Sequence, residues 1–527
     1  MELNTYLGQK GYTIAKNEIS IEQQKQIKTE LTIKPFVMGS PMNSSDVKTF
    51  PAYRESANKI YVPHYYGVEK FGPPKQYNIA ECDDINLEFN GKLRENQEIV
   101  VNTYIEHVNK VGFGGGLLEL PCAYGKTVLS LNIISRVNKK TFIIVHKEFL
   151  LNQWIERIQQ FLPKARVGRI QGPIIDIDDK DIVIGMLQSL SMKEYPSSIF
   201  ESFGLTIIDE VHHISSEVFS NSLFKIVTKY MLGLSATMNR KDGTTKVFKM
   251  FLGDVVFKGK RDESREVVVH AIKYEVDDEE FNEVKLDYRG NPAYSTMISK
   301  LCEYNRRSEF ILKVLSDMLE NNPNQQIMII AHNKNLLKYL HDAIAHRNIA
   351  TVGYYIGGMK ETALKETEGK KIVIATYSMA AEALDIKSLT TLIMATPKTD
   401  IEQSVGRILR EKHSKPIVVD IIDGHSLFQN QWRKRKTFYK KENYKILYTS
   451  SNLYTPDTSK WTIAFNPCLK DCSKSNTNKK STFSDEKKGS SDISNVKEYD
   501  NHVSDDEEEQ PKDKFLTGVC LLKFKKI

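Results

Sequence analysis

Hydrophobic positions in the middle of the chain fall into short unbroken runs that alternate with longer stretches of helical spacing. A strand buried on both faces needs nearly continuous apolar side chains, which is typical of parallel sheets covered by helices. Residues 93–256 are therefore predicted to form a parallel α/β domain. Its strands are expected in the runs Gly116–Leu120, Thr141–Val145, Asp181–Gly185, Leu205–Asp209 and Tyr230–Leu234.

A second alternation of the same kind covers residues 301–446 and predicts a second α/β domain of similar size. A charged stretch, 257–300, is expected to connect the two domains. The strands of the second domain are expected in the runs Gln326–Ala331, Ala350–Tyr355, Lys371–Thr376, Thr391–Ala395 and Pro416–Ile422.

The two ends of the chain differ from this pattern. Tyr and Pro recur in residues 1–92, which favours short strands and turns in an N-terminal accessory domain. Residues 447–527 are expected to form a C-terminal extension, mostly disordered from about residue 470, where Ser, Asn, Lys and Asp prevail and Asp505–Glu509 forms an acidic run. The apolar segment Phe515–Phe524 could fold back as a strand or dock onto a partner.

Composition narrows the class of protein without naming a function. The length of 527 residues suggests about three domains, and the net charge of +7 permits a polyanionic partner without requiring one. Six scattered cysteines fit reduced thiols. With no apolar run long enough to span a bilayer and no secretory signal in Met1–Thr5, we expect a soluble intracellular protein without a membrane partner.

The segment Leu120–Thr127 has the features of a phosphate-binding loop. It follows an expected strand and precedes an expected helix, which is the context such loops need. Gly125 lets the backbone turn its amides toward phosphates, Lys126 can reach the β- and γ-phosphates, and the Thr127 hydroxyl can bind Mg²⁺. The segment therefore predicts ATP and Mg²⁺ as cofactors.

Two further segments end expected strands of the same domain. Asp209 is a candidate Mg²⁺ ligand, and Glu210 is placed to orient and deprotonate an attacking water. His212 is assigned a polar coupling role rather than a metal site. The segment Ser235-Ala236-Thr237 is a candidate link between the nucleotide site and the neighbouring domain.

Three polar residues of the second domain share one face of an expected helix. Gln403, Arg407 and Arg410 lie at i, i+4 and i+7, while the intervening apolar residues can pack the helix down. Cations that arrive from a second domain suit a cleft in which phosphoryl charge develops in the transition state. We therefore predict that these residues complete the catalytic site.

Taken together, these segments resemble those of a superfamily 2 helicase with a DExH-type box, over residues 93 to 440. The resemblance implies two tandem RecA-like domains and assigns adenine recognition to Arg94 and Gln97. It implies ATP-binding roles for Leu120, Pro121, Cys122, Ala123, Tyr124, Gly125, Lys126 and Thr127, and coupling roles for Val211, His212, Ser235, Ala236, Thr237 and Asp385. It also implies nucleic-acid contacts at His146-Lys147, Gln188, Ser189, His332-Asn333 and Thr376.

Within the superfamily the chain is most similar to the XPB-like group, through Leu120-Pro121-Cys122, Asn152-Gln153-Trp154 and Arg240-Lys241-Asp242-Gly243. The N-terminal strings Leu31–Pro35 and Tyr66–Gly72 resemble the A18-type transcript-release helicases of large cytoplasmic DNA viruses. That resemblance implies a host-cytoplasmic or virion location. Ala123 and Ala383 stand where the group has Gly, so loop geometry is expected to differ there.

The function expected from these observations is an ATP-dependent helicase or translocase that acts on duplex or single-stranded DNA in viral transcription or repair. An RNA helicase remains the alternative within the enzyme class, and a non-catalytic clamp that recruits transcription-machinery proteins through its tail is the alternative outside it. The motor subunit of a restriction enzyme is disfavoured because the sequence lacks a nuclease carboxylate–lysine cluster.

Overall fold

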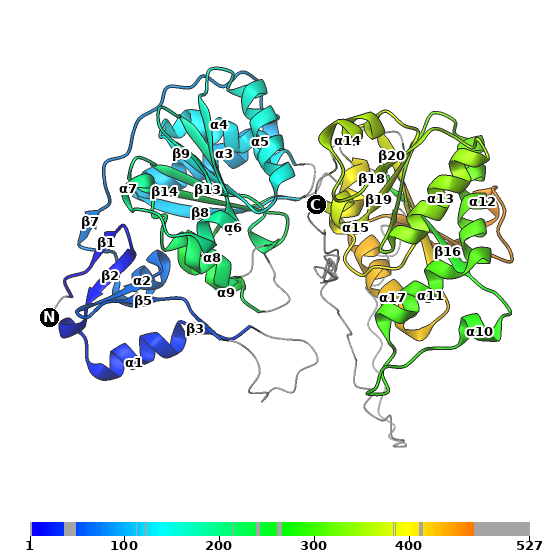
Figure 1. Ribbon diagram of the computed structural model, residues 1–527, viewed down its shortest axis with the longest axis horizontal. Coiled ribbons are helices and arrows are strands. Elements are labelled where there is room, and N and C mark those ends of the chain that lie inside the picture. Colours follow the sequence, from blue (N-terminus) through cyan, green and yellow to red (C-terminus); the bar gives the residue numbers. More distant parts are fainter. Residues whose placement is uncertain are drawn as a thin grey trace, which may run out of the picture.

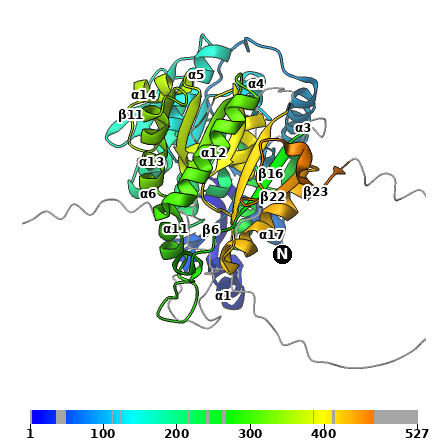
Figure 2. The same cartoon turned by 90° about the vertical axis from the view of Figure 1, so that its right-hand side faces the viewer.

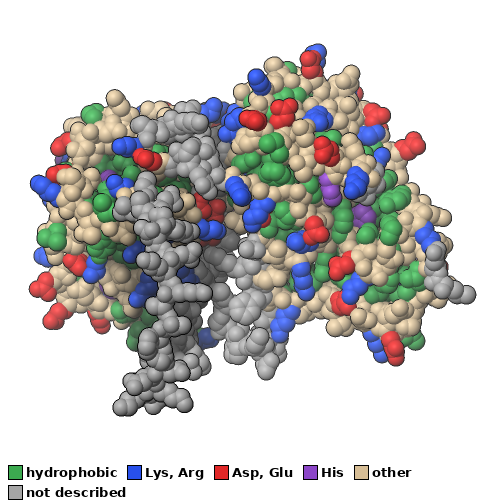
Figure 3. Space-filling model, turned by 180° about the vertical axis from the view of Figure 1, so that it is seen from behind, with side chains coloured by type: hydrophobic (Ala, Val, Ile, Leu, Met, Phe, Trp, Pro, Cys, Tyr) green, Lys and Arg blue, Asp and Glu red, His purple; other side chains and the backbone are tan. Residues whose placement is uncertain are grey.

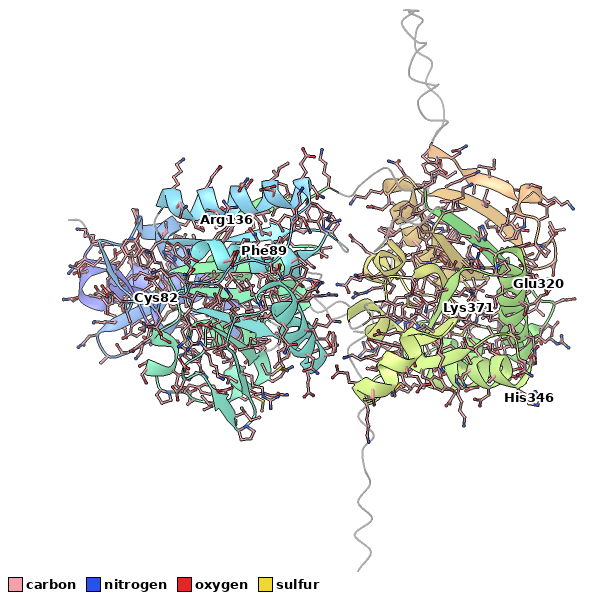
Figure 4. The ribbon with its side chains drawn as sticks, turned by 90° about the horizontal axis from the view of Figure 1, so that it is seen from above. Cys82, Phe89, Arg136, Glu320, His346 and Lys371 are labelled. Atoms are coloured by element: carbon pink, nitrogen blue, oxygen red, sulfur yellow. The ribbon has the colours of Figure 1, made fainter. Side chains whose placement is uncertain are left out.

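The computed structural model describes residues 3–35, 49–111, 113–121, 124–213, 216–238, 243–260, 266–382, 384, 386–409 and 415–467. In Figure 1 two α/β domains lie side by side, and a small N-terminal domain packs below the first of them. Arg136 marks the first and Lys371 the second α/β domain in the view from above (Figure 4). The predicted α/β class with two parallel sheets is confirmed, whereas the predicted tail lies outside the described residues.

The first α/β domain is built on a sheet with the strand order β11-β10-β12-β9-β13-β14-β8-β15. Neighbouring strands are parallel, except for the antiparallel pair β10–β11 at one edge. All five predicted strands are present. The strands are β8 (Gly114–Glu119), β9 (Thr141–Val145), β10 (Val167–Gln171), β11 (Ile174–Asp176), β12 (Ile182–Met186), β13 (Leu205–Ile208), β14 (Tyr230–Ser235) and β15 (Val255–Lys258).

Helices cover both faces of this sheet, which explains its unbroken apolar strands. One core lies between the sheet and the helices that carry Val100, Leu129 and Trp154; the other face packs against helices that carry Leu190 and Phe248. On the first face lie α3 (Glu95–Val111), α4 (Lys126–Val137) and α5 (Glu148–Phe161), and on the second α6 (Leu187–Met192), α7 (Ser198–Glu201), α8 (Ser216–Leu223) and α9 (Thr245–Leu252). A short 3₁₀ helix, η2 (Val211–His213), follows β13.

The second α/β domain has a sheet with the order β18-β19-β17-β20-β21-β16-β22-β23. Its neighbouring strands are parallel, except for the final pair β22–β23. The five predicted strands are again present. The strands are β16 (Val268–Tyr274), β17 (Gln326–Ala331), β18 (Val352–Tyr355), β19 (Ile372–Thr376), β20 (Leu389–Met394), β21 (Ile417–Asp423), β22 (Lys445–Ser450) and β23 (Thr462–Phe465).

The second sheet extends beyond the predicted boundaries of its domain. β16 lies in the stretch predicted to connect the domains, yet it pairs with both β21 and β22 inside the sheet. β22 and β23 fall largely in the predicted C-terminal extension. Polar residues such as His270 and Lys273 interrupt the apolar run of β16, and this hides the strand in a charged stretch of sequence.

Helices also cover both faces of the second sheet, as the side view shows (Figure 2). Two buried ion pairs fasten helices to β21: Arg307 of α12 binds Asp423, and Arg435 of α17 binds Asp420. The helices are α10 (Glu279–Asn282), α11 (Tyr294–Glu303), α12 (Asn305–Asn321), α13 (Lys334–His346), α14 (Glu361–Glu368), α15 (Tyr377–Glu382), α16 (Glu402–Gly406) and α17 (Ser426–Lys441), with the 3₁₀ helices η3 (Arg407–Leu409) and η4 (Thr458–Lys460).

The N-terminal domain is a small sheet with the order β5-β6-β2-β1-β7, and it shares one apolar core with the first α/β domain. The hydroxyl of Tyr65 donates to the Gly115 carbonyl at 3.2 Å, and the guanidinium of Arg54 lies 5.3 Å from the Phe224 ring centre. The elements are β1 (Tyr6–Gly8), β2 (Gly11–Ala15), η1 (Lys16–Glu18), α1 (Ile21–Glu30), β3 (Thr32–Ile33), β4 (Phe50–Pro51), β5 (Arg54–Glu55), β6 (Lys59–Val62), α2 (His64–Phe71) and β7 (Gln76–Asn78).

The surface carries charges of both signs. On the face seen from behind, Lys and Arg side chains are interspersed with Asp and Glu over both α/β domains (Figure 3). This agrees with the modest net charge of +7. No helix in the described part of the chain is long and apolar enough to cross a lipid bilayer.

Candidate nucleotide site between the two α/β domains

The phosphate-binding loop lies at the C-terminal end of β8, immediately before α4. Gly125 precedes α4 with a φ of +86°, a backbone conformation that favours glycine. A Cβ atom on this residue would lie 2.4 Å from Gln97 Nε2. Lys126 and Thr127 form the first turn of α4, where backbone amides without helical partners point toward a bound anion.

Arg94 and Gln97, the predicted adenine-binding residues, hold the loop from the side of α3. Both side chains donate to the backbone carbonyl of Tyr124, Arg94 Nη2 at 2.5 Å and Gln97 Nε2 at 2.9 Å. The Tyr124 hydroxyl donates to the Asn96 carbonyl at 3.3 Å. The segment from Arg94 to Gln97 is thus hydrogen-bonded to Tyr124 of the phosphate-binding loop. Leu120 and Pro121 lead into the loop, whereas Cys122 and Ala123 lie outside the described residues.

Asp209 follows β13 and is buried beneath the site. Its Oδ2 atom accepts the indole N–H of Trp154 at 2.9 Å, and its Oδ1 atom accepts the backbone N–H of Glu210 at 3.0 Å. Burial raises the pKa of Asp209, as does the adjacent Glu210 charge, whereas Lys126 and the Trp154 hydrogen bond act in the opposite direction. The ionised form of such a buried carboxylate is stabilised by any cation that binds next to it.

Glu210 adopts a left-handed backbone conformation, with a φ of +48°. This conformation is uncommon for a residue with a side chain, and it concentrates at functional sites. It directs the carboxylate toward the phosphate loop, where Oε1 lies 2.6 Å from Lys126 Nζ. The two side chains are only 12% and 19% exposed, so the pair is shielded from bulk water.

His212 extends this contact to the remaining predicted segments. Its Nδ1 lies 3.3 Å from Glu210 Oε2 and 2.7 Å from Ser235 Oγ, and its Nε2 lies 3.1 Å from Gln403 Nε2 of the second α/β domain. Both ring nitrogens of His212 thus lie within hydrogen-bond distance of polar side chains, and the tautomer of the ring decides which nitrogen donates. Ser235 Oγ in turn donates to the Thr237 carbonyl.

The strand register explains why segments far apart in sequence meet here. β14 pairs with β8 and with β13, so Ser235 lies opposite Glu119 and next to the strand that ends before Asp209. The Leu120 amide donates to the Ser235 carbonyl at 2.8 Å. Val211 and Ala236 are buried beside these polar residues. The chain Lys126–Glu210–His212–Gln403 therefore runs from the phosphate loop to the second domain.

Arg407 lies one helical turn after Gln403, where the α-helix continues into a 3₁₀ helix, but its side chain contacts its own domain. Its guanidinium donates to the carbonyls of Ala380, Ala381 and Leu384 at the end of α15. In this structure Arg407 thus stabilises a helix end of its own domain. Arg410 and Asp385 lie outside the described residues.

The predicted nucleic-acid residues of the first domain lie at the C-terminal ends of adjacent strands. His146 and Lys147 follow β9, while Gln188 and Ser189 follow β12, which pairs with β9. Gln188 Nε2 donates to the His146 carbonyl at 2.7 Å, and Ser189 Oγ accepts the Gly172 amide at 2.9 Å. These four residues therefore form one edge of the domain.

The second domain has a corresponding edge. His332 and Asn333 follow β17, and Thr376 ends the neighbouring strand β19, opposite Ala331. His332 Nδ1 lies 2.9 Å from Thr396 Oγ1, and Thr376 Oγ1 lies 3.3 Å from Ser378 Oγ. The candidate contacts of each domain thus lie at one edge of its sheet, and their role in nucleic-acid binding stays a prediction.

The donor set fits Mg²⁺ that is shared with a nucleotide. Among the described residues, no group of three or more His, Cys, Asp or Glu side chains is arranged to hold a metal. Mg²⁺ in nucleotide sites is usually held by one or two protein oxygens together with phosphates and water. The buried carboxylate of Asp209 and the Thr127 hydroxyl at the start of α4 suit this type of binding.

Trp154 is a residue near the site whose role the sequence did not reveal. The string Asn152-Gln153-Trp154 indicates only a family resemblance, yet the indole of Trp154 donates to Asp209, the candidate Mg²⁺ ligand. The sequence indicates only that a buried tryptophan needs a hydrogen-bond acceptor for its N–H. The acceptor lies 55 positions away, so spacing alone could not identify it.

Comparison with known proteins places the chain in a family. Residues 90–240 match the family model described as "Type III restriction enzyme, res subunit", and residues 310–412 match "Helicase conserved C-terminal domain". A protein of Acanthamoeba polyphaga mimivirus described as "Putative ATP-dependent RNA helicase L396" is 35% identical over 460 residues, which cover 84% of this chain and 86% of the relative. "Putative helicase 161L" of Invertebrate iridescent virus 6 is 25% identical over 82% of this chain and 98% of its own length.

Among solved structures, S. cerevisiae Dbp5 bound to RNA and ADP BeF3 aligns with 68% of this chain and 94% of its own length, at 11% identity and a TM-score of 0.47. The family models and the viral relatives show an ATP-hydrolysing helicase. The chain belongs to the superfamily 2 helicases of large DNA viruses, the family of the mimivirus protein L396.

Proposed function

We propose that this helicase hydrolyses ATP at the cleft between its two α/β domains and uses the cycle to move along or separate strands of nucleic acid. The observation that carries the proposal is the continuous contact from Lys126 through Glu210 and His212 to Gln403. It joins the phosphate loop, the acidic segment and the second domain, which are the parts that a nucleotide-driven closure has to connect.

Each residue of the site has a proposed task. Lys126 would leave Glu210 for the β- and γ-phosphates, and Glu210 would then be available to orient and deprotonate water. Thr127 and Asp209 would hold Mg²⁺, which neutralises phosphate charge when bound. Arg94 and Gln97 would contact the adenine while they keep the loop carbonyl in place.

The second domain would complete the site on closure. Gln403 is already close to His212 and is proposed to position water and the γ-phosphate. Arg407 and Arg410 are proposed to supply positive charge in the transition state. Arg407 would first have to exchange the α15 carbonyls for phosphate oxygens, so its role requires a rearrangement of this helix end.

We propose DNA as the polymer and transcript release in viral transcription as the setting, in the host cytoplasm or virion. The XPB-like strings, among them Leu120-Pro121-Cys122, and the A18-type strings of the N-terminal domain support this narrower assignment. RNA is the second candidate, because relatives from mimivirus and African swine fever virus are described as ATP-dependent RNA helicases. Recruitment of transcription proteins by the C-terminal segment is also a proposal.

The test is the ATPase rate of the full chain with single-stranded DNA, duplex DNA and RNA in parallel. We expect duplex DNA to stimulate most, and Lys126→Ala to abolish the stimulated rate while nucleic-acid binding persists. Lys249→Ala is the matched control, because Lys249 also pairs with a carboxylate but at the protein surface, where its Nζ lies 3.0 Å from Asp254 Oδ1. A wild-type rate in Lys126→Ala would overturn the site, and stimulation by RNA alone would overturn the choice of polymer.

A further inference from the structure

Trp154 has an environment that differs from that of an ordinary core tryptophan. It lies in α5, is 1% exposed, and packs in the core between the sheet and its helices. Its indole N–H is directed at Oδ2 of Asp209, whereas the indole of Trp461 donates to the backbone carbonyl of Thr455. A carboxylate can rotate about its side-chain bond, so a hydrogen bond from the indole helps to orient it. A backbone carbonyl is already held in place by the chain.

The two hydrogen bonds to Asp209 hold both of its oxygens. Oδ2 accepts from Trp154 at 2.9 Å, and Oδ1 accepts the amide of Glu210 at 3.0 Å. The Glu210 amide is itself part of the left-handed turn that directs the Glu210 carboxylate at Lys126. A change in the angle of the Asp209 carboxylate would therefore also disturb the turn that sets Glu210.

The other side of α5 contacts the second domain. Glu156 Oε1 lies 2.9 Å from Lys365 Nζ, and Asn152 Nδ2 lies 3.4 Å from Glu361 Oε2, both on α14. Phe149, in the first turn of α5, packs against apolar cores of both α/β domains. One short helix thus contacts the candidate Mg²⁺ ligand and the neighbouring domain.

We propose that Trp154 is a positioning residue for ATP hydrolysis, and that α5 transmits the contact between the two domains to the Asp209 carboxylate. The inference rests on the proposed function, because it needs ATP and Mg²⁺ at this site. When the second domain moves relative to the first, α5 shifts with it through Phe149, which packs against both domains, and through its contacts with α14. The indole N–H then changes the orientation of Asp209, and with it the turn at Glu210.

Trp154→Phe tests the positioning role, since it keeps an aromatic ring and removes the donor. We expect binding of the slowly hydrolysed analogue ATPγS, measured by calorimetry, to weaken about tenfold in Mg²⁺ and to stay unchanged in EDTA, because partners of metal ligands typically affect metal affinity by 10- to 100-fold. Trp432→Phe, a buried tryptophan of α17, is the matched control and should change neither value.

The same experiment separates this inference from the proposed function. If the wild type fails to bind ATPγS with Mg²⁺, the proposed function fails. If it binds and Trp154→Phe shows equal losses with and without Mg²⁺, or no loss, the positioning role is overturned. Trp154 can also be observed directly by its fluorescence in a Trp432→Phe/Trp461→Phe background, where Mg²⁺ should alter its response to ATPγS.

Transmission through α5 is tested by a double-mutant cycle. Phe149→Ala and Trp154→Phe are each expected to lower the nucleic-acid-stimulated turnover number several-fold, and the double variant is expected to lose much less than the product of the two. Phe161→Ala, at the far end of α5 where its ring stacks on Phe89, should combine with Trp154→Phe multiplicatively. Multiplicative losses for Phe149→Ala as well would overturn transmission through this helix.

Discussion

Two regions of the molecule bury aspartates in or directly after an interior strand of their sheet, but these aspartates have different hydrogen-bond partners. In the first α/β domain Asp209 follows β13 and accepts hydrogen bonds from the Trp154 indole and the Glu210 amide, both of them neutral donors. In the second, Asp420 and Asp423 lie in β21 and each binds a buried arginine, Arg435 and Arg307 respectively. All three aspartates are at most 7% exposed.

The hydrogen-bond partners distinguish a carboxylate that can bind a cation from one that has a structural role. Both oxygens of Asp423 are taken by Arg307, at 2.6 and 2.9 Å, so its charge is neutralised within the fold. Asp209 keeps a raised pKa because burial outweighs the effects of Lys126 and of its hydrogen bonds. A buried carboxylate without a cationic partner can bind a cation that enters the site. A buried carboxylate that is paired with an arginine instead stabilises the packing of helix against sheet.

The largest effect on stability is expected when a structural pair is broken. Arg307→Met leaves Asp423 buried without its cation, and removing one member of such a pair typically costs about 3–5 kcal/mol. We expect the urea transition of the second domain to shift strongly downward. Trp154→Phe leaves Trp432 and Trp461, both in the second domain, to report this transition by fluorescence.

The control for this prediction is the exposed pair of the same domain, Arg347 and Glu309, whose side chains are 46% and 43% exposed. Arg347→Met removes the same type of charge but leaves Glu309 in water, so its urea transition should stay close to that of the wild type. Equal shifts in the two variants would contradict the distinction between buried and exposed pairs.

A moderate effect is expected on coupling between the domains. His212→Ala and Gln403→Ala each interrupt the contact between Glu210 and the second domain. Contacts in such networks carry roughly 0.5–2 kcal/mol of coupling, so nucleic-acid stimulation of the ATPase should fall about two- to thirtyfold. For His212→Ala the basal rate should fall less, and a stronger effect on its basal than on its stimulated turnover would argue against a coupling role.

The smallest effect concerns pH. The Arg347 guanidinium, together with the Tyr339 hydroxyl, lowers the pKa of Glu309 to about 2. A carboxyl with a depressed folded-state pKa stabilises the fold above its ordinary pKa near 4.5 and loses this contribution as the pH falls toward 2. Over that window the wild type should lose slightly more stability than Arg347→Met. A larger loss of stability in Arg347→Met than in the wild type would contradict this prediction.

The sequence predicts which edge of the first domain holds the candidate site, but not which buried side chains contact the residues of that site. Continuous apolar runs mark buried parallel strands, so residues that end them, such as Asp209 and Glu210, can be placed at one edge. The same pattern places Asp423 after Ile421-Ile422, and only the structure shows that Arg307 neutralises it. Partners that are distant in sequence leave no periodic signal, and this applies equally to Trp154 and Asp209.

Two features of the second domain also could not be predicted from the sequence pattern. The spacing of Gln403 and Arg407 predicts one helical face, but nothing in the sequence indicates that the Arg407 guanidinium donates to the Ala380 carbonyl of α15. The sequence does not predict β16, because its polar residues His270 and Lys273 resemble those of the charged stretch around it. Both differences depend on tertiary contacts that override local pattern.

Glu210→Gln tests the central claim most directly, because it removes the candidate base while it keeps the size of the side chain. The measurement is γ-phosphate release in a single turnover of ATP with nucleic acid bound. Since a positioned base contributes about 100-fold or more, we predict a loss of that size with ATP and nucleic-acid binding retained. Phosphate release at the wild-type rate would contradict the assignment of this edge of the first domain as the catalytic site.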